Sequence, residues 1–116
     1  MRVLVVEDQW YVANALKALL EAEGIEVSGP AATTADALRL ASEQKPVLAV
    51  VDMSLRGEMA YDLIDQLHDQ GVRSVVVSGY AVLPRLNGKV AVLQKPFNRR
   101  DLLEALRSTL CGQAPM

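Results

Sequence analysis

The sequence Val-Leu-Ala-Val-Val-Asp at residues 47–52 decides the fold of this chain. Five apolar residues, three of them β-branched, follow Pro46 and end in an acidic residue. This length and composition are typical of a strand that is buried on both faces, as in a parallel sheet. Asp52 then lies at the carboxyl end of the strand, where functional groups gather in open α/β sheets. Its carboxylate is therefore either an ordinary loop residue or a functional one.

Similar strands alternate with helical patterns along the rest of the chain. We expect four more strands, at residues 2–6, 25–28, 73–77 and 90–93. We expect helices at residues 9–23, from Thr33 onward, at about 59–70 and from Asn98 to Leu110. Five strand-helix units with right-handed crossovers predict a doubly wound parallel α/β sheet with helices on both faces. Pro84 and Asn87-Gly88 interrupt residues 80–89, so we expect a short or irregular fourth helix there.

Length and composition exclude several classes of protein. The 116 residues predict one domain at 1–116, with a core at about 2–110 and a frayed tail at 111–116. A net charge of −2 gives no basic surface for nucleic acid. Cys111 is the only cysteine, and the first apolar run, residues 3–6, is too short for a signal peptide or a membrane span. We therefore expect a cytoplasmic protein with neither a nucleic-acid nor a membrane partner.

Polar residues follow the strands that we expect to meet at one edge of the sheet. They are Glu7, Asp8, Asp52, Ser78 and Lys95. Two carboxylates that lie about 5 Å apart repel each other by roughly 3 kcal/mol when the effective dielectric constant is near 20. A divalent cation removes that repulsion, and Mg²⁺ favours a few carboxylates with water and phosphate oxygens. A metal, a lysine, a hydroxyl group and a nucleophilic carboxylate together predict phosphoryl transfer through an aspartyl phosphate.

Four short motifs carry a family resemblance. They are Val-Val-Glu-Asp at 5–8, Val-Val-Asp-Met-Ser-Leu at 50–55, Val-Val-Ser-Gly-Tyr at 76–80 and Gln-Lys-Pro-Phe at 94–97. In this order they resemble the receiver domain of bacterial two-component response regulators, over essentially the whole chain. Details around them resemble the stand-alone receivers called "FAT GUY". The resemblance implies a flavodoxin-like (βα)5 fold with strand order 2-1-3-4-5, which brings the strand-end residues together.

The resemblance also implies the metal site and the phosphorylation site. Asp52 is expected to accept a phosphoryl group from a histidine kinase or a histidine phosphotransfer protein. Mg²⁺ is expected on Asp8, on Asp52 and on the backbone carbonyl of Ser54, with Glu7 acting through water. Lys95 is expected to pair with Asp52 and then with the phosphoryl oxygens.

Further roles follow from the same resemblance. Ser78 is expected to donate a hydrogen bond to the phosphoryl group, together with the backbone N–H groups of Met53 and Gly79. The peptide bond between Lys95 and Pro96 is expected to be cis.

The sequence departs from the family pattern at the switch residue. Most receivers have an aromatic residue three positions before the lysine, but this chain has Val92 there. Our hypothesis is that Tyr80 supplies the moving ring instead. Because the segment at 80–89 is short, dimerisation through the last helix and its neighbours is less expected, and we predict a monomer.

Three residues are candidates for partner docking. Arg99 and Arg100 begin the last helix, where cations oppose the helix dipole by a few tenths of a kcal/mol each. They are either solvated arginines or a docking patch for an acidic kinase surface. Trp10 is either a partner contact or a partly exposed ring.

Other functions stay open beside the stand-alone receiver. The chain could be a degenerate receiver that binds partners without phosphorylation, or a receiver segment of a hybrid kinase. A dehalogenase-like phosphatase requires an Asp-x-Asp motif that Glu7-Asp8-Gln9-Trp10 does not provide. A flavodoxin-like cofactor binder requires a phosphate loop where this chain has acids. We expect no enzymatic activity beyond self-phosphorylation and autodephosphorylation.

Overall fold

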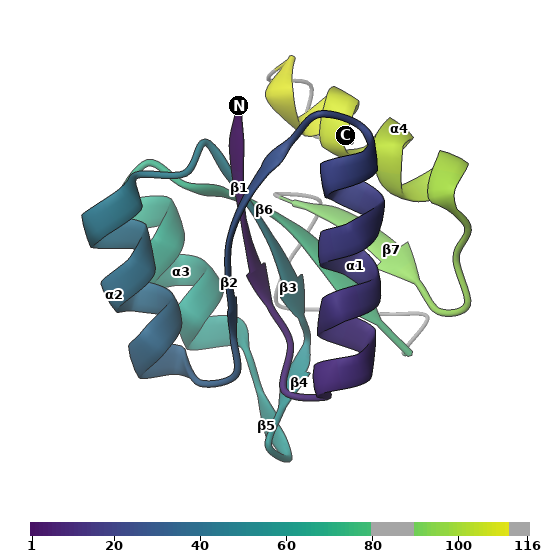
Figure 1. Ribbon diagram of the computed structural model, residues 1–116. Coiled ribbons are helices and arrows are strands. Elements are labelled where there is room, and N and C mark those ends of the chain that lie inside the picture. The colour runs from purple at the N-terminus through teal and green to yellow at the C-terminus, as the bar shows by residue number, and fades with distance from the viewer. Residues whose placement is uncertain (80–89, 112–116) are drawn as a thin grey trace.

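The computed structural model describes residues 1–79 and 90–111. Five parallel strands form the main sheet in the order β2-β1-β3-β6-β7 (Figure 1). Their bounds are β1 Arg2–Val6, β2 Glu26–Ala31, β3 Leu48–Asp52, β6 Arg73–Ser78 and β7 Ala91–Gln94. Two short strands, β4 Ser54–Leu55 and β5 Glu58–Met59, form a separate two-stranded sheet. Counted within the main sheet alone, the strand order is the predicted 2-1-3-4-5.

Helices cover both faces of this sheet. Their bounds are α1 Trp10–Ala22, α2 Thr34–Gln44, α3 Tyr61–Asp69 and α4 Arg99–Leu110. In Figure 1, α2 and α3 lie on one side of the sheet and α1 and α4 on the other. The flavodoxin-like doubly wound fold is thereby confirmed.

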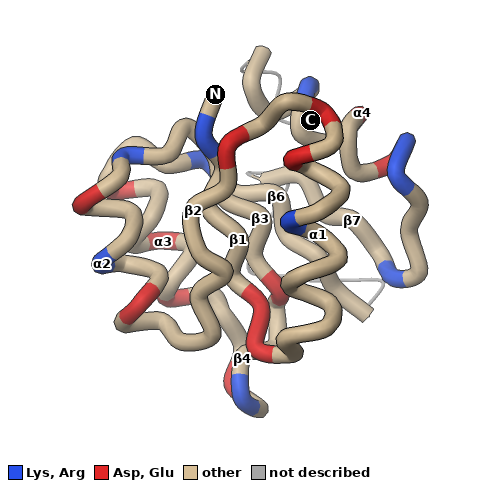
Figure 2. The backbone as a smooth tube through the Cα atoms, viewed as in Figure 1, with Lys and Arg blue, Asp and Glu red and all other residues tan. Residues whose placement is uncertain are grey.

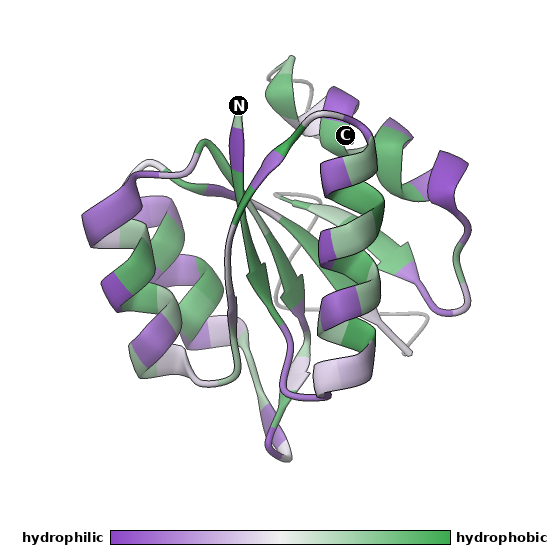
Figure 3. Ribbon diagram, in the orientation of Figure 1, coloured by the Kyte–Doolittle hydropathy of each residue, from purple (hydrophilic) through white to green (hydrophobic). Residues whose placement is uncertain are grey.

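Side chains that alternate along the strands divide the core into two clusters, one on each face of the sheet. In β1, Leu4 and Val6 contact the α2 and α3 side, whereas Val3 and Val5 contact the α1 and α4 side. Every residue of β3 is buried, as expected for the central strand. Val47, which we expected to begin this strand, precedes it and is 45% exposed. Figure 3 shows the hydrophobic colouring concentrated on the strands and the inner sides of the helices. Burial on both faces therefore fixes β3 in the middle of the sheet.

Side chains cap two helices at their first turns. The Thr33 hydroxyl oxygen accepts a hydrogen bond from the Asp36 N–H at 3.1 Å before α2. Asn98 and Asp101 form a reciprocal capping box at the start of α4. Each cap satisfies backbone donors that a helix leaves free in its first turn.

The second strand is longer than predicted. We expected Gly29-Pro30 to end it at Ser28, but β2 continues to Ala31 through a cis Gly29–Pro30 bond. The register shifts there, since Leu4 pairs with Ser28 whereas Val6 pairs with Ala31. Such a bulge accommodates one extra residue, and an edge strand tolerates a proline that lacks an N–H.

A small hairpin follows Asp52, where we predicted no strand. Ser54 pairs with Met59 and Leu55 with Glu58, so the loop between them has only two residues. Arg56 and Gly57 both have positive φ, at 51° and 82°. These values are typical of the two-residue turns that match the twist of paired strands. The helix expected from Met59 consequently begins at Tyr61.

Some expectations lie outside the described residues. These are the short fourth helix at 80–89, the Tyr80 switch and most of the frayed tail. Within the parts of the chain that the structure describes, no helix is both long and apolar enough to cross a bilayer.

Gly29 gives a test of the bulge. Its φ is 92°, and an added Cβ would lie 2.7 Å from the Ala31 nitrogen and 3.0 Å from the Val5 oxygen. Gly29→Ala should lower the free energy of unfolding by roughly 2 to 4 kcal/mol, because backbone strain and overlap with backbone atoms add. Urea unfolding measures this loss.

Gly24→Ala is the matched control. Gly24 has a similar φ of 79°, but an added Cβ would meet no atom within 4 Å. It should lose only about 1 kcal/mol, from the backbone conformation alone. Equal losses for the two variants would show that the bulge is not tightly packed.

Candidate functional site

The pairing of β1 with β3 places two acids side by side. Val6 is the partner of Val51 in the parallel register, so the next residues of the two strands are Glu7 and Asp52. Because side chains alternate along a strand, both acids project to the α1 and α4 side, as Val5 and Val50 do. The two carboxyl groups therefore meet at the end of the sheet, on one face.

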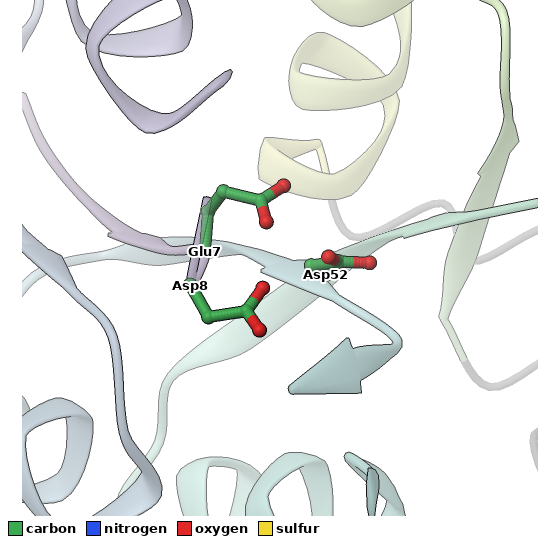
Figure 4. A group of neighbouring side chains, drawn as sticks. All are labelled: Glu7, Asp8 and Asp52. Carbon is green, nitrogen blue, oxygen red and sulfur yellow. The ribbon is translucent and has the colours of Figure 1, made fainter. Parts of the chain in front are cut away.

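Asp8 completes a group of three acids. One oxygen from each of Glu7, Asp8 and Asp52 lies within 4.8 Å of the others. Figure 4 shows the three carboxyl groups around a common space, and Figure 2 shows acidic positions gathered where β1 and β3 end. Glu7 is only 2% exposed and Asp52 9% exposed. The predicted convergence of these acids is present in the structure.

Lys95 supplies the cation beside them. Its Nζ lies 3.7 Å from Asp52 Oδ1 and 4.0 Å from Glu7 Oε1. Its side chain is 37% exposed, so it reaches the buried acids from the surface. The Lys95–Pro96 bond is cis, as the family resemblance implies.

Ser78 lies at the same end of the sheet. It is the last residue of β6 and is 1% exposed. Its backbone carbonyl accepts a hydrogen bond from the Lys95 N–H at 2.7 Å. Gly79 follows as an exposed residue. The structure thus places Ser78 and Lys95 next to each other through their backbones.

The pKa values of two of the acids move in opposite directions. Burial, followed by hydrogen bonding with Asp52, raises the pKa of Glu7 to about 7. The Gln9 N–H, which donates to Glu7 Oε2 at 3.2 Å, and the charge of Lys95 oppose this rise. The pKa of Asp8 is lowered, mainly because the Arg56 N–H donates a hydrogen bond to its carboxylate.

The structure corrects one expected main-chain donor. We expected the Met53 N–H to contact a phosphoryl group, but it donates to the Val77 carbonyl at 2.8 Å and is part of the sheet. The next residue, Ser54, has its N–H 3.3 Å from Asp52 Oδ1 instead. Ser54 is therefore the residue whose amide reaches the carboxylate, and it also begins β4.

The three docking candidates do not form one patch. Trp10 is 75% exposed at the start of α1, where its ring meets that of Tyr11 edge to face. Arg99 forms an ion pair with Glu23, which follows the other end of α1. Because a helix rises 1.5 Å per residue, Trp10 and Glu23 lie about 20 Å apart along α1. Arg99 and Arg100 line a groove on α4 with Leu103, Glu104 and Arg107.

A second groove lies next to the acids. It is lined by Gln9, Val12, Lys95, Pro96 and Phe97. Val92, the residue at the usual position of the aromatic switch, is 43% exposed on β7. Sequence reasoning named Lys95 and Pro96 as site residues but missed Gln9, Val12 and Phe97.

Comparison with known proteins identifies the family. The sequence model of the response regulator receiver domain matches residues 3–107. The chain belongs to this family. Receiver domains bind Mg²⁺ at an acidic pocket and interact with histidine kinases or phosphotransfer proteins, and the described residues of this chain include such an acidic group.

Individual relatives fit this assignment. A receiver domain from Methanospirillum hungatei JF-1 is 34% identical, with a TM-score of 0.85 over 97% of this chain and 94% of that one. Sporulation initiation phosphotransferase F of Bacillus subtilis is 22% identical over 94% of this chain and 93% of its own length. The transcriptional regulatory protein PdtaR of Mycobacterium tuberculosis is 30% identical, and the match covers 90% of this chain. It covers only 54% of PdtaR, so the chain spans about half the length of that relative.

The raised pKa of Glu7 predicts how the free energy of unfolding of the metal-free protein depends on pH. The folded protein holds the Glu7 proton up to about pH 7, whereas the unfolded chain releases it near the ordinary value of 4.5. The folded state therefore binds more protons between these values, and the free energy of unfolding should fall as pH rises from about 4.5 to 7. The fall should be on the order of 2 to 3 kcal/mol.

Glu7→Gln isolates this contribution. The variant removes the titrating group but keeps an oxygen that can accept from the Gln9 N–H. Urea unfolding in EDTA at several pH values should show wild type losing stability toward pH 8 relative to Glu7→Gln. Parallel curves for the two proteins would contradict the assigned pKa.

Proposed function

We propose that this receiver domain accepts a phosphoryl group on Asp52 from a phosphohistidine of a kinase or a phosphotransfer protein. The observation that carries the proposal is the position of the Asp52 carboxylate. It lies 3.7 Å from the Lys95 ammonium group and within one cluster with two further acids. A lone carboxylate at a strand end is usually a loop residue, but this one has the partners that phosphoryl transfer needs.

The acid group also suits a magnesium ion. Carboxylate and carbonyl oxygens are the ligands that Mg²⁺ prefers. Burial, followed by hydrogen bonding with Asp52, raises the pKa of Glu7, so a cation in this site would favour its charged form. Asp8, Asp52 and the Ser54 carbonyl would hold the ion, with Glu7 acting through water. When bound, Mg²⁺ would neutralise charge on the carboxylates and on the phosphoryl oxygens.

The residues of the chain account for the transfer step. An Asp52 oxygen forms a bond to phosphorus while the bond from phosphorus to the donor imidazole nitrogen breaks. The electron pair of that bond stays on the imidazole, which then binds a proton. Lys95 pairs with Asp52 before the transfer and with the phosphoryl oxygens after it. The Ser78 hydroxyl and the Gly79 N–H are the proposed hydrogen-bond donors to the phosphoryl group.

A donor histidine must approach from the open end of the sheet. The groove between α1 and the Lys95–Phe97 segment lies at this end, and Trp10 stands exposed near it. We propose this groove as the main docking surface. Arg100, on the outer side of α4, is proposed to add attraction for an acidic partner at longer range.

The last part of the proposal concerns how this domain passes on its signal. Receiver domains are signalling modules, and we propose that this one acts in the cytoplasm, as a monomer, through protein contacts that phosphorylation biases. Tyr80 is the proposed switch ring. The mycobacterial relative is a transcriptional regulatory protein. The comparisons therefore do not support our expectation that this protein has no nucleic-acid partner. No observation favours the degenerate receiver or the hybrid-kinase segment over this proposal.

Phosphorylation of Asp52 can be tested by intact mass. Wild type incubated with Mg²⁺ and acetyl phosphate should gain one phosphoryl adduct that is acid-stable and base-labile, and Asp52→Asn should gain none. An adduct that persists in Asp52→Asn would move the phosphorylation site elsewhere. A third outcome is that a control receiver is modified, this chain is not, and beryllofluoride leaves Trp10 fluorescence unchanged. This outcome would favour the interpretation of the chain as a degenerate receiver.

Arg100 can be tested with any histidine kinase that phosphorylates the wild-type chain. Arg100→Glu should lower kcat/KM for transfer from the kinase about three-fold or more, because a rim charge mainly affects the rate of encounter. Phosphorylation by acetyl phosphate should not change. Arg99→Glu is a less clean variant because it also breaks the ion pair with Glu23. Equal rates of transfer to wild type and Arg100→Glu would exclude Arg100 from docking.

A further inference from the structure

The β4–β5 hairpin contacts two of the three clustered acids through its backbone. The Arg56 N–H donates to Asp8 Oδ2 at 2.9 Å, and the Ser54 N–H lies 3.3 Å from Asp52 Oδ1. Figure 1 shows the hairpin extending from the end of the sheet where β1 and β3 finish. One hairpin thus joins Asp8, which follows β1, to Asp52, which ends β3.

The geometry of the turn leaves the Arg56 N–H available for this contact. In a two-residue hairpin, the flanking residues, here Leu55 and Glu58, form the closing pair of the ladder. Arg56 is a turn residue, so its N–H takes no part in the pairing and is available to another acceptor. The Asp8 carboxylate supplies that acceptor.

The base of the hairpin is fixed by the core. Leu55 is 5% exposed and belongs to the cluster under α2 and α3. The Ala60 N–H donates to the Met53 carbonyl at 2.7 Å, which closes the loop behind the two strands. The turn is therefore presented to Asp8 from a rigid support.

We propose that the β4–β5 hairpin is a positioning element for the metal site, in which the Arg56 N–H orients the Asp8 carboxylate for Mg²⁺. A carboxylate has two oxygens, so the hydrogen bond at Oδ2 leaves the other oxygen for a metal. Hydrogen bonds to ligating carboxylates fix their orientation, and losing one typically lowers metal affinity 10- to 100-fold. The inference rests on the Mg²⁺ site of the proposed function.

This proposal concerns the turn conformation and the Arg56 N–H, not the charge of the Arg56 side chain. Gly57 has a φ of 82°, which a β-branched residue adopts only with strain. An added Cβ at Gly57 would meet no atom within 4 Å, so Gly57→Val changes the backbone preference without a steric clash. Gly71 has a φ of 81° in equally open space after α3, and Gly71→Val is the matched control.

The test is a Mg²⁺ titration of the whole chain followed by Trp10 fluorescence. Gly57→Val should bind Mg²⁺ about 10-fold more weakly than wild type, whereas Gly71→Val should bind it normally despite a similar loss of thermal stability. Gly57→Asn should restore most of the affinity, because asparagine tolerates positive φ. Arg56→Asn keeps the N–H and the turn and removes a cation near Asp8, so it should bind Mg²⁺ at least as tightly as wild type.

A second measurement does not depend on any variant folding. In ¹H–¹⁵N spectra of the wild-type chain, the Arg56 amide proton should keep the downfield shift of a hydrogen-bonded group when Mg²⁺ is added. An upfield move would mean that the metal displaces the hairpin from Asp8, which overturns the proposal.

The remaining outcomes separate this inference from the proposed function. If wild type binds Mg²⁺, Asp8→Asn does not, and Gly57→Val binds as Gly71→Val does, the hairpin has no positioning role and the metal site stands. If wild type binds no Mg²⁺, the metal site and the positioning role fall together, while phosphorylation of Asp52 is judged separately by its mass adduct.

Discussion

The register between β1 and β3 determines where the functional groups of this protein lie. Four residue pairs, ending at Val6 beside Val51, hold the two strands so that Glu7 and Asp52 follow side by side. A slip of one residue would turn one carboxyl group to the opposite face of the sheet. Buried aliphatic residues on both faces oppose such a slip, because it would bring them out of their clusters. Apolar packing therefore keeps together acids that would otherwise repel each other.

Much of this arrangement could be predicted because it depends on regular patterns. Continuous apolar runs mark strands that are buried on both faces, and an acid directly after such a run must lie at the edge of the sheet. This reasoning places Glu7, Asp52 and Lys95 at one end. The order of the strands came from the resemblance of the motifs to a family, since the spacing of strands alone does not fix which strands are neighbours.

The features that escaped prediction depend on backbone groups and tertiary contacts. The Arg56 N–H reaches Asp8 across 48 residues, and a main-chain donor leaves no mark in the sequence. The hairpin was missed because two-residue turns usually show Asn-Gly or Asp-Gly, not Arg-Gly. Met53 was assigned a role that its N–H cannot fill while it pairs with Val77. The partner of Arg99 could not be foreseen, because it depends on how α4 packs near the end of α1.

The bulge in β2 also has a consequence for how copies of this protein can associate. β2 is an edge of the main sheet, and an edge strand is a template on which another chain can add a strand. Pro30 removes one donor from this edge, and the bulge beside it interrupts regular spacing. At the other end of the strand, the Arg2–Glu26 ion pair adds charge. This edge therefore resists growth of the sheet from one molecule to the next, which protects the protein from aggregation.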